Sequence, residues 1–228
     1  MYRDAMETPK NPTSINHRIR EGLARLAVVQ RSDDWERAKG SGLNPTQLAI
    51  LDLLQGRPTG LGIQAIARQL VLSQPTVTES VQALVRKGLV DKRAGTDRRA
   101  VTIVLNADGR AASATGDDAE TSLAHAVNCL AGDEQEAFLL ALVRIIRQLQ
   151  EVGAIPVQRM CTTCRYFDPF AHADADRPHH CHYVNASFGQ RDIRIDCREH
   201  ETADPAFQAA TWDVFAKGWT ATPPGYGD

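Results

Sequence analysis

The sequence predicts a mainly α-helical protein with one small β-hairpin and a separate cysteine-rich region toward its C-terminal end. Three observations lead to this fold class. Apolar residues recur at helical spacing over most of residues 14–153, the period changes to two over 89–105, and four of the five cysteines fall between Cys161 and Cys197. The 228 residues are enough for one large domain or two small ones.

Composition divides the chain into four parts. Residues 1–13 lack periodicity and are expected to be a flexible N-terminal arm, 14–153 carry the helices and the hairpin, and 156–202 carry the clustered cysteines. Residues 203–228 form an aromatic segment and a Pro/Gly-rich tail. Its aromatic residues predict a short closing helix that packs on this chain or on a partner subunit: Phe207, Trp212, Phe215 and Trp219.

Charge is distributed unevenly along the chain. The formal net charge is −2. Residues 60–110 nevertheless carry eight Lys/Arg against four Asp/Glu, a net of +4, whereas 156–228 carry seven against ten, a net of −3. A basic middle segment is therefore masked by acidic flanks.

The N-terminus has no apolar run of the kind that a signal peptide needs, and no stretch reaches the ~20 apolar residues of a membrane span. We therefore expect a cytoplasmic protein with no membrane partner. In that reducing compartment, metal binding is a better first explanation for clustered cysteines than disulfides.

The first predicted helices are amphipathic. Residues 15–35 place Ile15, Ile19, Leu23, Leu26 and Ala27 at helical spacing. A second helix begins at Asn44-Pro45-Thr46, and its buried stripe consists of Leu48, Leu51 and Leu54.

Two further helices are predicted on either side of a tight turn. Residues 63–70 form the first, with Ile63, Ile66, Ala67 and Leu70 on one face. The second begins at Ser73, a favourable N-cap, and carries Pro75 in its first turn. It ends at Gly88, because helices commonly end with a glycine in the left-handed backbone conformation. Its buried face is predicted to hold Val77, Val81, Leu84 and Val85.

A β-hairpin with a charged tip follows. Residues 89–93 form one strand, 94–97 the turn, and 100–105 a strand in which Val101, Ile103 and Leu105 alternate. From Asn106 to about Val152 the pattern is helical again, with a break near 131–133. The last helix carries the apolar residues Phe138, Leu139, Leu142, Val143, Ile146 and Leu149.

Helix, turn, helix and charged hairpin in this order are the plan of a winged helix-turn-helix. The second helix can enter the major groove, where base edges are distinguishable, and the hairpin can probe the adjacent minor groove. The candidate DNA-binding residues are Ser73, Gln74, Thr76, Thr78 and Glu79 on the helix and Lys92, Arg93, Arg98 and Arg99 on the wing, with Asp97 between them.

Over about residues 14–152 the chain resembles the MarR family of regulators, through LNPTQLAILDLL, LVRKGLV and the D-x-R run Asp97-Arg98-Arg99. The resemblance implies that Asp97 holds the wing through an ion pair and that Arg99 reaches the minor groove. It also implies a homodimer with intertwined first and last helices, a palindromic double-stranded operator and, in many relatives, a small-molecule effector. Glu79 departs from the pattern, because an acid facing the groove either reads a cytosine amino group or weakens backbone binding.

The cysteines form a second candidate site. Cys161 and Cys164 make a CxxC pair, Cys181 follows after sixteen residues and Cys197 after fifteen more. Four thiolates can hold zinc or an iron–sulfur cluster, and His180, His182 or His200 could replace one of them in a zinc site. Buried thiols without metal are a further reading. Cys129, alone on a helix, is expected to be a small buried hydrophobe rather than a reactive thiol.

The CxxCRYF opening and the sixteen-residue gap look like the cluster-binding run of high-potential iron–sulfur proteins, in which an aromatic shell surrounds a four-iron cluster. By that resemblance, Tyr166, Phe167, Tyr183 and Phe188 would form the shell. We therefore favour an iron–sulfur cluster over zinc.

Three functions follow from these readings. The first is a MarR-like regulator that senses redox or iron status through the cluster, the second such a regulator with structural zinc and an aromatic effector, and the third an electron-transfer module without specific DNA binding. The sequence contains no Gly-rich phosphate loop, nucleophile motif or HExxH, so an enzyme is not expected.

Overall fold

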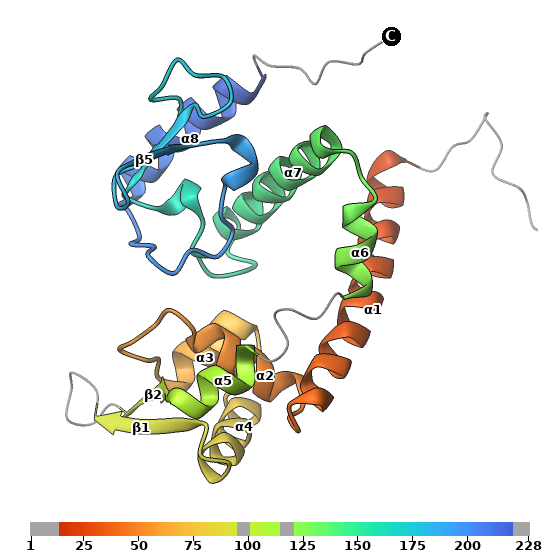
Figure 1. Ribbon diagram of the computed structural model, residues 1–228, viewed down its shortest axis with the longest axis vertical. Helices are drawn as coiled ribbons and strands as arrows, with labels where there is room; N and C mark the ends of the chain where they lie inside the picture. Colours follow the sequence, from red (N-terminus) through yellow and green to blue (C-terminus); the bar gives the residue numbers. More distant parts are fainter. Residues whose placement is uncertain (1–13, 95–100, 115–120, 221–228) are drawn as a thin grey trace, which may run out of the picture.

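The computed structural model describes residues 14–94, 101–114 and 121–220. These residues form two bodies joined along one side by a long helix (Figure 1). We call the first body the winged-helix module: it contains α2 (Pro45–Leu54), α3 (Ile63–Leu70), α4 (Gln74–Arg86), β1 (Val90–Ala94), β2 (Val101–Leu105) and α5 (Ala107–Ala114). The predicted mainly helical class with one small hairpin is confirmed.

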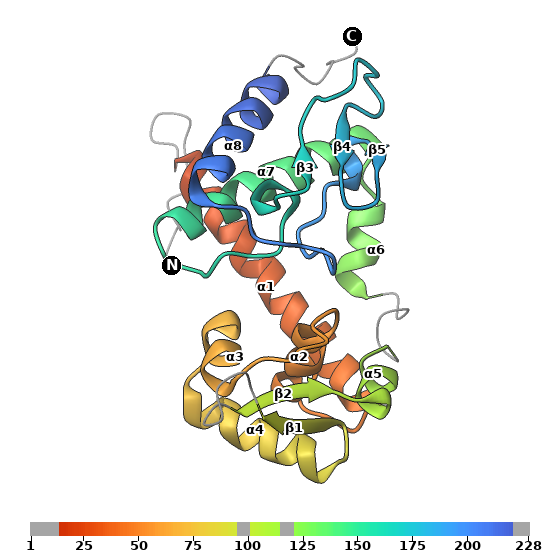
Figure 2. The same cartoon turned by 90° about the vertical axis from the view of Figure 1, so that its left-hand side faces the viewer.

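The second body contains α7 (Gly132–Glu151) and the part of the chain that follows it, residues 156–220, which we call the cysteine region. The cysteine region contains η1 (Cys161–Thr163), β3 (Phe167–Asp168), β4 (His179–Cys181), β5 (Ala186–Phe188), η2 (Gln190–Asp192) and α8 (Pro205–Thr220). Helix α1 (Ile15–Gly40) runs from one body to the other with α6 (Ser122–Asn128) beside it (Figures 1 and 2).

Local capping fixes the helix ends as the sequence predicts. The Asn44 side chain accepts the Gln47 backbone N–H at 2.8 Å, and Ser73 Oγ accepts the Thr76 N–H at 3.3 Å. Gly88 ends α4 with a φ of +71°, in the left-handed region where a side chain is disfavoured. These caps start α2 and α4 at the predicted residues.

The winged-helix module has an aliphatic core. Its fully buried side chains come from α2, α3, α4 and both strands: Leu48, Ile50, Leu51, Leu54, Ile66, Val77, Val81, Leu84, Val90 and Ile103. The hairpin pairs antiparallel from Val90↔Leu105 to Ala94↔Val101, and Leu61, in the loop before α3, bridges Ile103 on β2. The α2–α3 loop is thus joined to the wing.

The cysteine region has a smaller core that it shares with α7. Strands β3, β4 and β5 form an antiparallel sheet in that order, with Cys181 opposite both Phe167 and Ala186. The core contains Leu140 and Val143 from α7, Phe167 from β3, Ile193, and Phe215 from α8. The predicted closing helix is confirmed as α8, on which Phe215 is fully buried and Phe207 is 41% exposed.

Four expectations about burial and extent are corrected. Val85 and Val101 are 37% and 51% exposed, because they lie at the edges of the module core rather than in it. The helical stretch after Asn106 is divided into α5 and α6 rather than continuous, with residues 115–120 outside the described residues. Cys129 is exposed, because it follows the last residue of the short α6 on a surface that the chain leaves uncovered. The predicted N-terminal arm and the end of the tail lie outside the described residues.

None of the helices in residues 14–94, 101–114 and 121–220 combines the length and the apolar character needed to cross a membrane.

Candidate functional site

The N-terminal face of α4 is a polar surface. Gln74, Thr76 and Glu79 are exposed, while Val77, Val81 and Leu84 anchor the opposite face in the core. The Ser73 hydroxyl accepts the Thr76 N–H and lies 2.7 Å from the Thr76 hydroxyl. This arrangement leaves side-chain donors and acceptors at the helix N-terminus, where the helix dipole also favours an anionic partner.

Not every predicted residue of α4 is free to reach a ligand. The Thr78 hydroxyl donates to the Gln74 backbone carbonyl at 2.8 Å, and Thr78 is only partly exposed. Gln74 and Thr76 are therefore better placed than Thr78 to contact a base edge. Glu79 stays on the exposed face as an acidic side chain.

The wing lies beside α4 as the hairpin β1–β2. Lys92 and Arg93 are both exposed on β1. Asp97, Arg98 and Arg99, which carry the D-x-R resemblance, lie outside the described residues.

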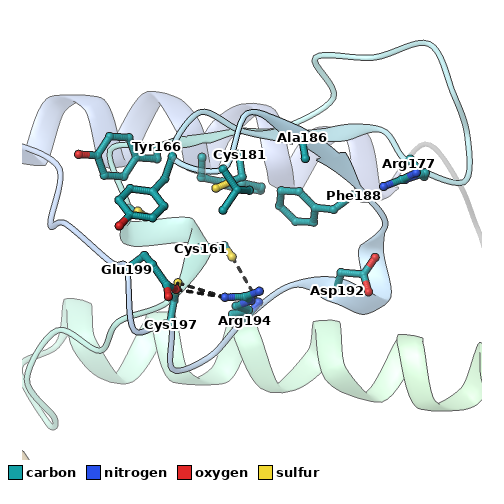
Figure 3. A pocket seen from close by; sticks show the side chains of 14 residues that line it. Cys161, Tyr166, Arg177, Cys181, Ala186, Phe188, Asp192, Arg194, Cys197 and Glu199 are labelled. Atoms are coloured by element: carbon teal, nitrogen blue, oxygen red, sulfur yellow. Dashed lines mark hydrogen bonds and ion pairs between the residues drawn. The ribbon is translucent and has the colours of Figure 1, made fainter. Parts of the chain in front are cut away.

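All four clustered cysteines line one cavity in the cysteine region. The cavity has a volume of about 380 Å³, and its walls include Cys161, Cys164, Cys181 and Cys197. Figure 3 shows Cys181 and Phe188 on one side of this cavity and Cys161, Cys197 and Arg194 on the other. The fold thus brings four thiols that span 37 residues of sequence around a single space.

Three different backbone elements position the four cysteines. Cys161 and Cys164 flank a 3₁₀ turn that is closed by the Cys164 N–H on the Cys161 carbonyl at 2.9 Å. Cys181 ends β4. Cys197 lies in a loop and donates its N–H to the Arg159 carbonyl at 2.9 Å. Backbone hydrogen bonds and strand pairing therefore set where each cysteine lies in the fold.

Aromatic rings and two arginines, Arg177 and Arg194, also line the cavity wall. Tyr166, Phe167, Tyr183 and Phe188, the residues predicted to form a shell, all line it. Arg194 donates its backbone N–H to Cys161 Sγ at 3.3 Å, and its guanidinium reaches Cys197 Sγ at 3.7 Å. Hydrogen bonds to a sulfur favour its thiolate form. Sequence reasoning missed Arg194, whose only signal was a position three residues before Cys197.

Burial opposes ionisation of two of the cavity thiols, those of Cys161 and Cys197. It raises the pKa of Cys161 to about 12, although the N–H of Arg194 acts in the opposite direction. Burial also raises the pKa of Cys197. Since metals and clusters bind thiolates, anything held here must displace protons from these sulfurs.

The histidines near the cysteines face other partners. His172 Nε2 and His180 Nδ1 lie 3.0 Å apart, His182 pairs with Asp168 at 3.4 Å, and His200 Nε2 lies 3.0 Å from the Thr163 hydroxyl. None of these histidines lines the cavity. The expectation that His180, His182 or His200 replaces a cysteine is therefore not matched by their positions.

His179 is a structural residue. It is fully buried among aromatic rings, its Nδ1 accepts the Phe170 N–H at 3.3 Å, and its Nε2 lies 3.1 Å from Gln190 Oε1. Burial lowers the pKa of His179 because the charged imidazolium loses hydration. It therefore belongs to the core of the cysteine region.

The spacing of the sulfurs bears on what the cavity can hold. Zinc bound by four thiolates at about 2.3 Å needs sulfurs only about 3.8 Å apart. Among the described residues, which include all four cysteines, no set of three or more Cys, His, Asp or Glu is arranged to hold a single metal ion. A four-iron cluster, in contrast, binds each thiolate to a different iron rather than all four to one ion.

Comparisons with known proteins bear on the winged-helix module. A family model described as MarR family matches residues 41–100. Comparison with curated proteins returned no match.

Several solved structures have a similar fold. CouR from Rhodococcus jostii RHA1, solved with bound p-coumaroyl-CoA, is 19% identical with a TM-score of 0.50, over 64% of this chain and 97% of its own. Sco5413, a MarR family transcriptional regulator from Streptomyces coelicolor, is 20% identical with a TM-score of 0.50, and the match covers 62% of this chain and 99% of Sco5413. The transcriptional regulator BldR from Sulfolobus solfataricus is 20% identical with a TM-score of 0.50, and the match covers 58% of this chain and 95% of BldR.

Residues 41–100 of this chain thus match the MarR family, and the chain has the winged helix-turn-helix fold of MarR-type regulators.

Proposed function

We propose that this protein is a homodimeric, DNA-binding transcriptional regulator of MarR type and that its four clustered cysteines hold an iron–sulfur cluster, with a four-iron cluster favoured. The cluster would make DNA binding responsive to redox or iron status. The observation that carries the proposal is the combination of a capped, polar α4 face on a winged-helix fold with one cavity lined by all four cysteines.

DNA binding is supported by the surface of the winged-helix module. Gln74 and Thr76 at the start of α4 supply neutral donors and acceptors for base edges, and Lys92 and Arg93 on the wing supply positive charge for phosphates. The module core holds α4 from behind through Val77, so the polar face is presented on a rigid element. Wing contacts of Arg98 and Arg99, with Asp97 as their support, remain part of the proposal.

Dimerisation is supported by an uncovered apolar stripe. On α1, Ile15 is 73% exposed and Ile19 50%. A helix face that only contacts water is usually polar, so repeated isoleucine and leucine there indicate a surface that another protein covers. Phe138 and Leu149 on α7 are each 38% exposed. A second copy that covers these surfaces would place two α4 helices about a two-fold axis, which suits a palindromic operator.

The cysteine region fits the proposed cofactor through its donor set. Four thiols and several aromatic rings line the cavity, and Arg194 donates to two of the sulfurs. When bound, a cluster of this kind supplies a reversible one-electron change and sensitivity to oxidants. The chain's own residues hold the sulfurs apart, shield them and partly neutralise their charge.

A small-molecule effector is a second candidate signal. CouR, which shares the fold, was solved with p-coumaroyl-CoA bound. A ligand of that kind would act together with the cysteine region or in place of it.

The test is anaerobic purification followed by absorption spectroscopy and iron, sulfide and zinc analysis of the same sample. We expect broad visible absorption, about four irons per chain as for a four-iron cluster, and a dimer in solution. Selection from randomised duplex DNA should recover a palindromic site that is bound with a steep salt dependence. A colourless protein with one zinc per chain would refute the cluster, and failure to select any duplex would refute the regulator.

A further inference from the structure

The two chain segments that carry Cys161 and Cys197 lie side by side. The Cys161 N–H donates to the Arg194 carbonyl at 3.0 Å, and the Cys197 N–H donates to the Arg159 carbonyl at 2.9 Å. Arg159 lies two residues before one cysteine and is bonded through its main chain to another. A change at either sulfur therefore bears directly on the position of Arg159.

The same two segments contact the C-terminal end of α2 in the winged-helix module. The Arg159 guanidinium lies 3.4 Å from the Gln55 carbonyl oxygen and 3.5 Å from that of Gly56. Arg198, the residue after Cys197, donates to Gln55 Oε1 at 2.9 Å. Asp196, the residue before Cys197, accepts from Arg159 Nε at 2.5 Å. We call Arg159, Asp196 and Arg198 the arginine clamp.

The chemistry of this contact is specific. A helix ends with unpaired carbonyls and a partial negative charge, which cationic side chains stabilise. Arg159 places its charge at the carbonyls of Gln55 and Gly56, the two residues that follow α2, with only 12% of its side chain exposed, and Asp196 balances that charge. Burial and, to a smaller extent, the charge of Arg159 lower the pKa of the neighbouring Arg57 guanidinium, while the charge of Asp196 acts in the opposite direction.

The fit is also close in shape. Gly56 has a φ of +66°, and a Cβ built on it would lie 2.8 Å from Arg198 Cγ. The glycine that ends α2 thus leaves the space that the Arg198 side chain occupies. No side chain fits at this position while the clamp is in place.

The contacted loop leads directly to the DNA-binding surface. Five residues after Gly56, Leu61 exchanges backbone hydrogen bonds with Ile103 on β2, at 3.1 and 2.8 Å. Helix α2 itself packs on α4. A shift at the end of α2 therefore acts on β2 of the wing and on α4, through contacts that already exist.

We infer that the Cys197 loop has a second role as the docking element between the cysteine region and the winged-helix module, and that the arginine clamp transmits the state of the four cysteines to DNA binding. This inference rests on the proposed function and names its route of regulation. Loss of what the cysteines hold frees the loop, withdraws Arg159 and Arg198 from α2, and loosens the α2–α3 loop together with the wing.

The test measures hydrogen exchange of amides in residues 55–62 in the full-length protein under anaerobic conditions, before and after removal of the cluster with ferricyanide and a chelator. Removal should raise exchange in 55–62 by about tenfold, in the range of ordinary allosteric coupling. In the double variant Arg159→Gln/Arg198→Gln, exchange should already be raised, and removal should add less than about twofold. Affinity for the selected duplex should follow the same pattern.

The matched control is Arg165→Gln. Arg165 follows Cys164 in the same region, carries the same charge and pairs with Glu201 at 3.5 Å on the exposed surface. This variant should respond to cluster removal as the unmodified protein does. Arg198→Gln alone, which changes an exposed residue, repeats the test if the double variant does not fold.

Cys197→Ser, used in place of chemical removal, separates the two proposals. Absence of iron from the unmodified protein refutes the cluster, whatever the loop does. The clamp is supported if Cys197→Ser raises exchange in 55–62 and Arg198→Gln abolishes that response. It is overturned if 55–62 does not respond to either treatment of the cysteines, or if the arginine variants respond fully.

Discussion

The winged-helix module and the cysteine region differ in what fills their interiors. The module is closed by interlocking aliphatic side chains, among them Ile50, Leu51, Ile66 and Leu84, each with no more than 1% of its surface exposed. The cysteine region has strands of only two or three residues, a few aromatic rings, and a cavity of about 380 Å³ where further core would otherwise lie.

This difference indicates how each part is stabilised. A core of packed aliphatic side chains supports a fold through burial alone. A small region with short strands and a cavity in its centre usually needs a metal, a cluster or disulfides in addition. In the described residues all the cysteines are free, so the cysteine region is where a bound group would contribute to folding.

The largest expected effect comes from removing a buried thiol. Cys164→Ser, at a site that is 8% exposed, should abolish visible absorption and bound iron and should unfold the cysteine region while the winged-helix module stays folded. Visible absorption, iron content and hydrogen exchange of both parts would measure this. Cys129→Ser, which changes an exposed cysteine outside the cavity, is the control and should keep its iron. Retention of iron by Cys164→Ser would contradict the idea that the cysteine region, unlike the winged-helix module, is stabilised by a group bound to Cys164.

Core truncations in the two parts come next. Phe215→Ala removes a fully buried ring between α8 and the small sheet and should cost about 3–5 kcal/mol of unfolding free energy. Leu51→Ala in α2 should cost about 2–5 kcal/mol. Hydrogen exchange by region should place the first loss mainly in the cysteine region and the second mainly in the winged-helix module. Equal loss in both parts from either variant would show that they unfold as one unit.

Substitutions on the surface of the winged-helix module should change DNA binding and leave the iron content unchanged. Gln74→Ala should weaken binding to the selected duplex by about 1–3 kcal/mol and relax its sequence preference, because an amide side chain can read a base edge. Lys92→Ala should instead weaken binding to all duplexes alike and lower the salt slope by about one. Binding titrations at several salt concentrations distinguish the two. A Gln74→Ala protein with unchanged sequence preference would remove Gln74 from the readout.

The smallest expected effect is local to the turn between α3 and α4. Val71 adopts a φ of +53°, which is strained for a β-branched residue, and its side chain is 67% exposed. Val71→Gly should therefore stabilise the winged-helix module by about 0.5–1 kcal/mol, the difference between relieved strain and the entropy cost of glycine. Chemical denaturation of the module measures this. A loss of stability would mean that the valine makes a contact that offsets its strain.

Local signals predicted most of the winged-helix module. Asn44, Ser73 and Gly88 each mark a helix end through chemistry within a few residues, and the change of period after Gly88 marks the hairpin. Val85 was misplaced because helical spacing does not show where a buried face ends. The exposure of Cys129 depends on which elements cover α6, and no pattern near Cys129 in the sequence states this.

For the candidate sites, residue types and their spacing can be read from the sequence, whereas only the tertiary structure shows how they assemble. Four clustered cysteines and the helix–turn–helix–hairpin order can be read from the chain because they depend on neighbours in sequence. The shared cavity and the turning away of the histidines depend on residues up to about 40 positions apart, and Arg159 and Arg198 reach Gln55 at the end of α2 from 104 and 143 positions along the chain. Such contacts arise only when packing brings distant backbone together, and for that reason only the tertiary structure decided them.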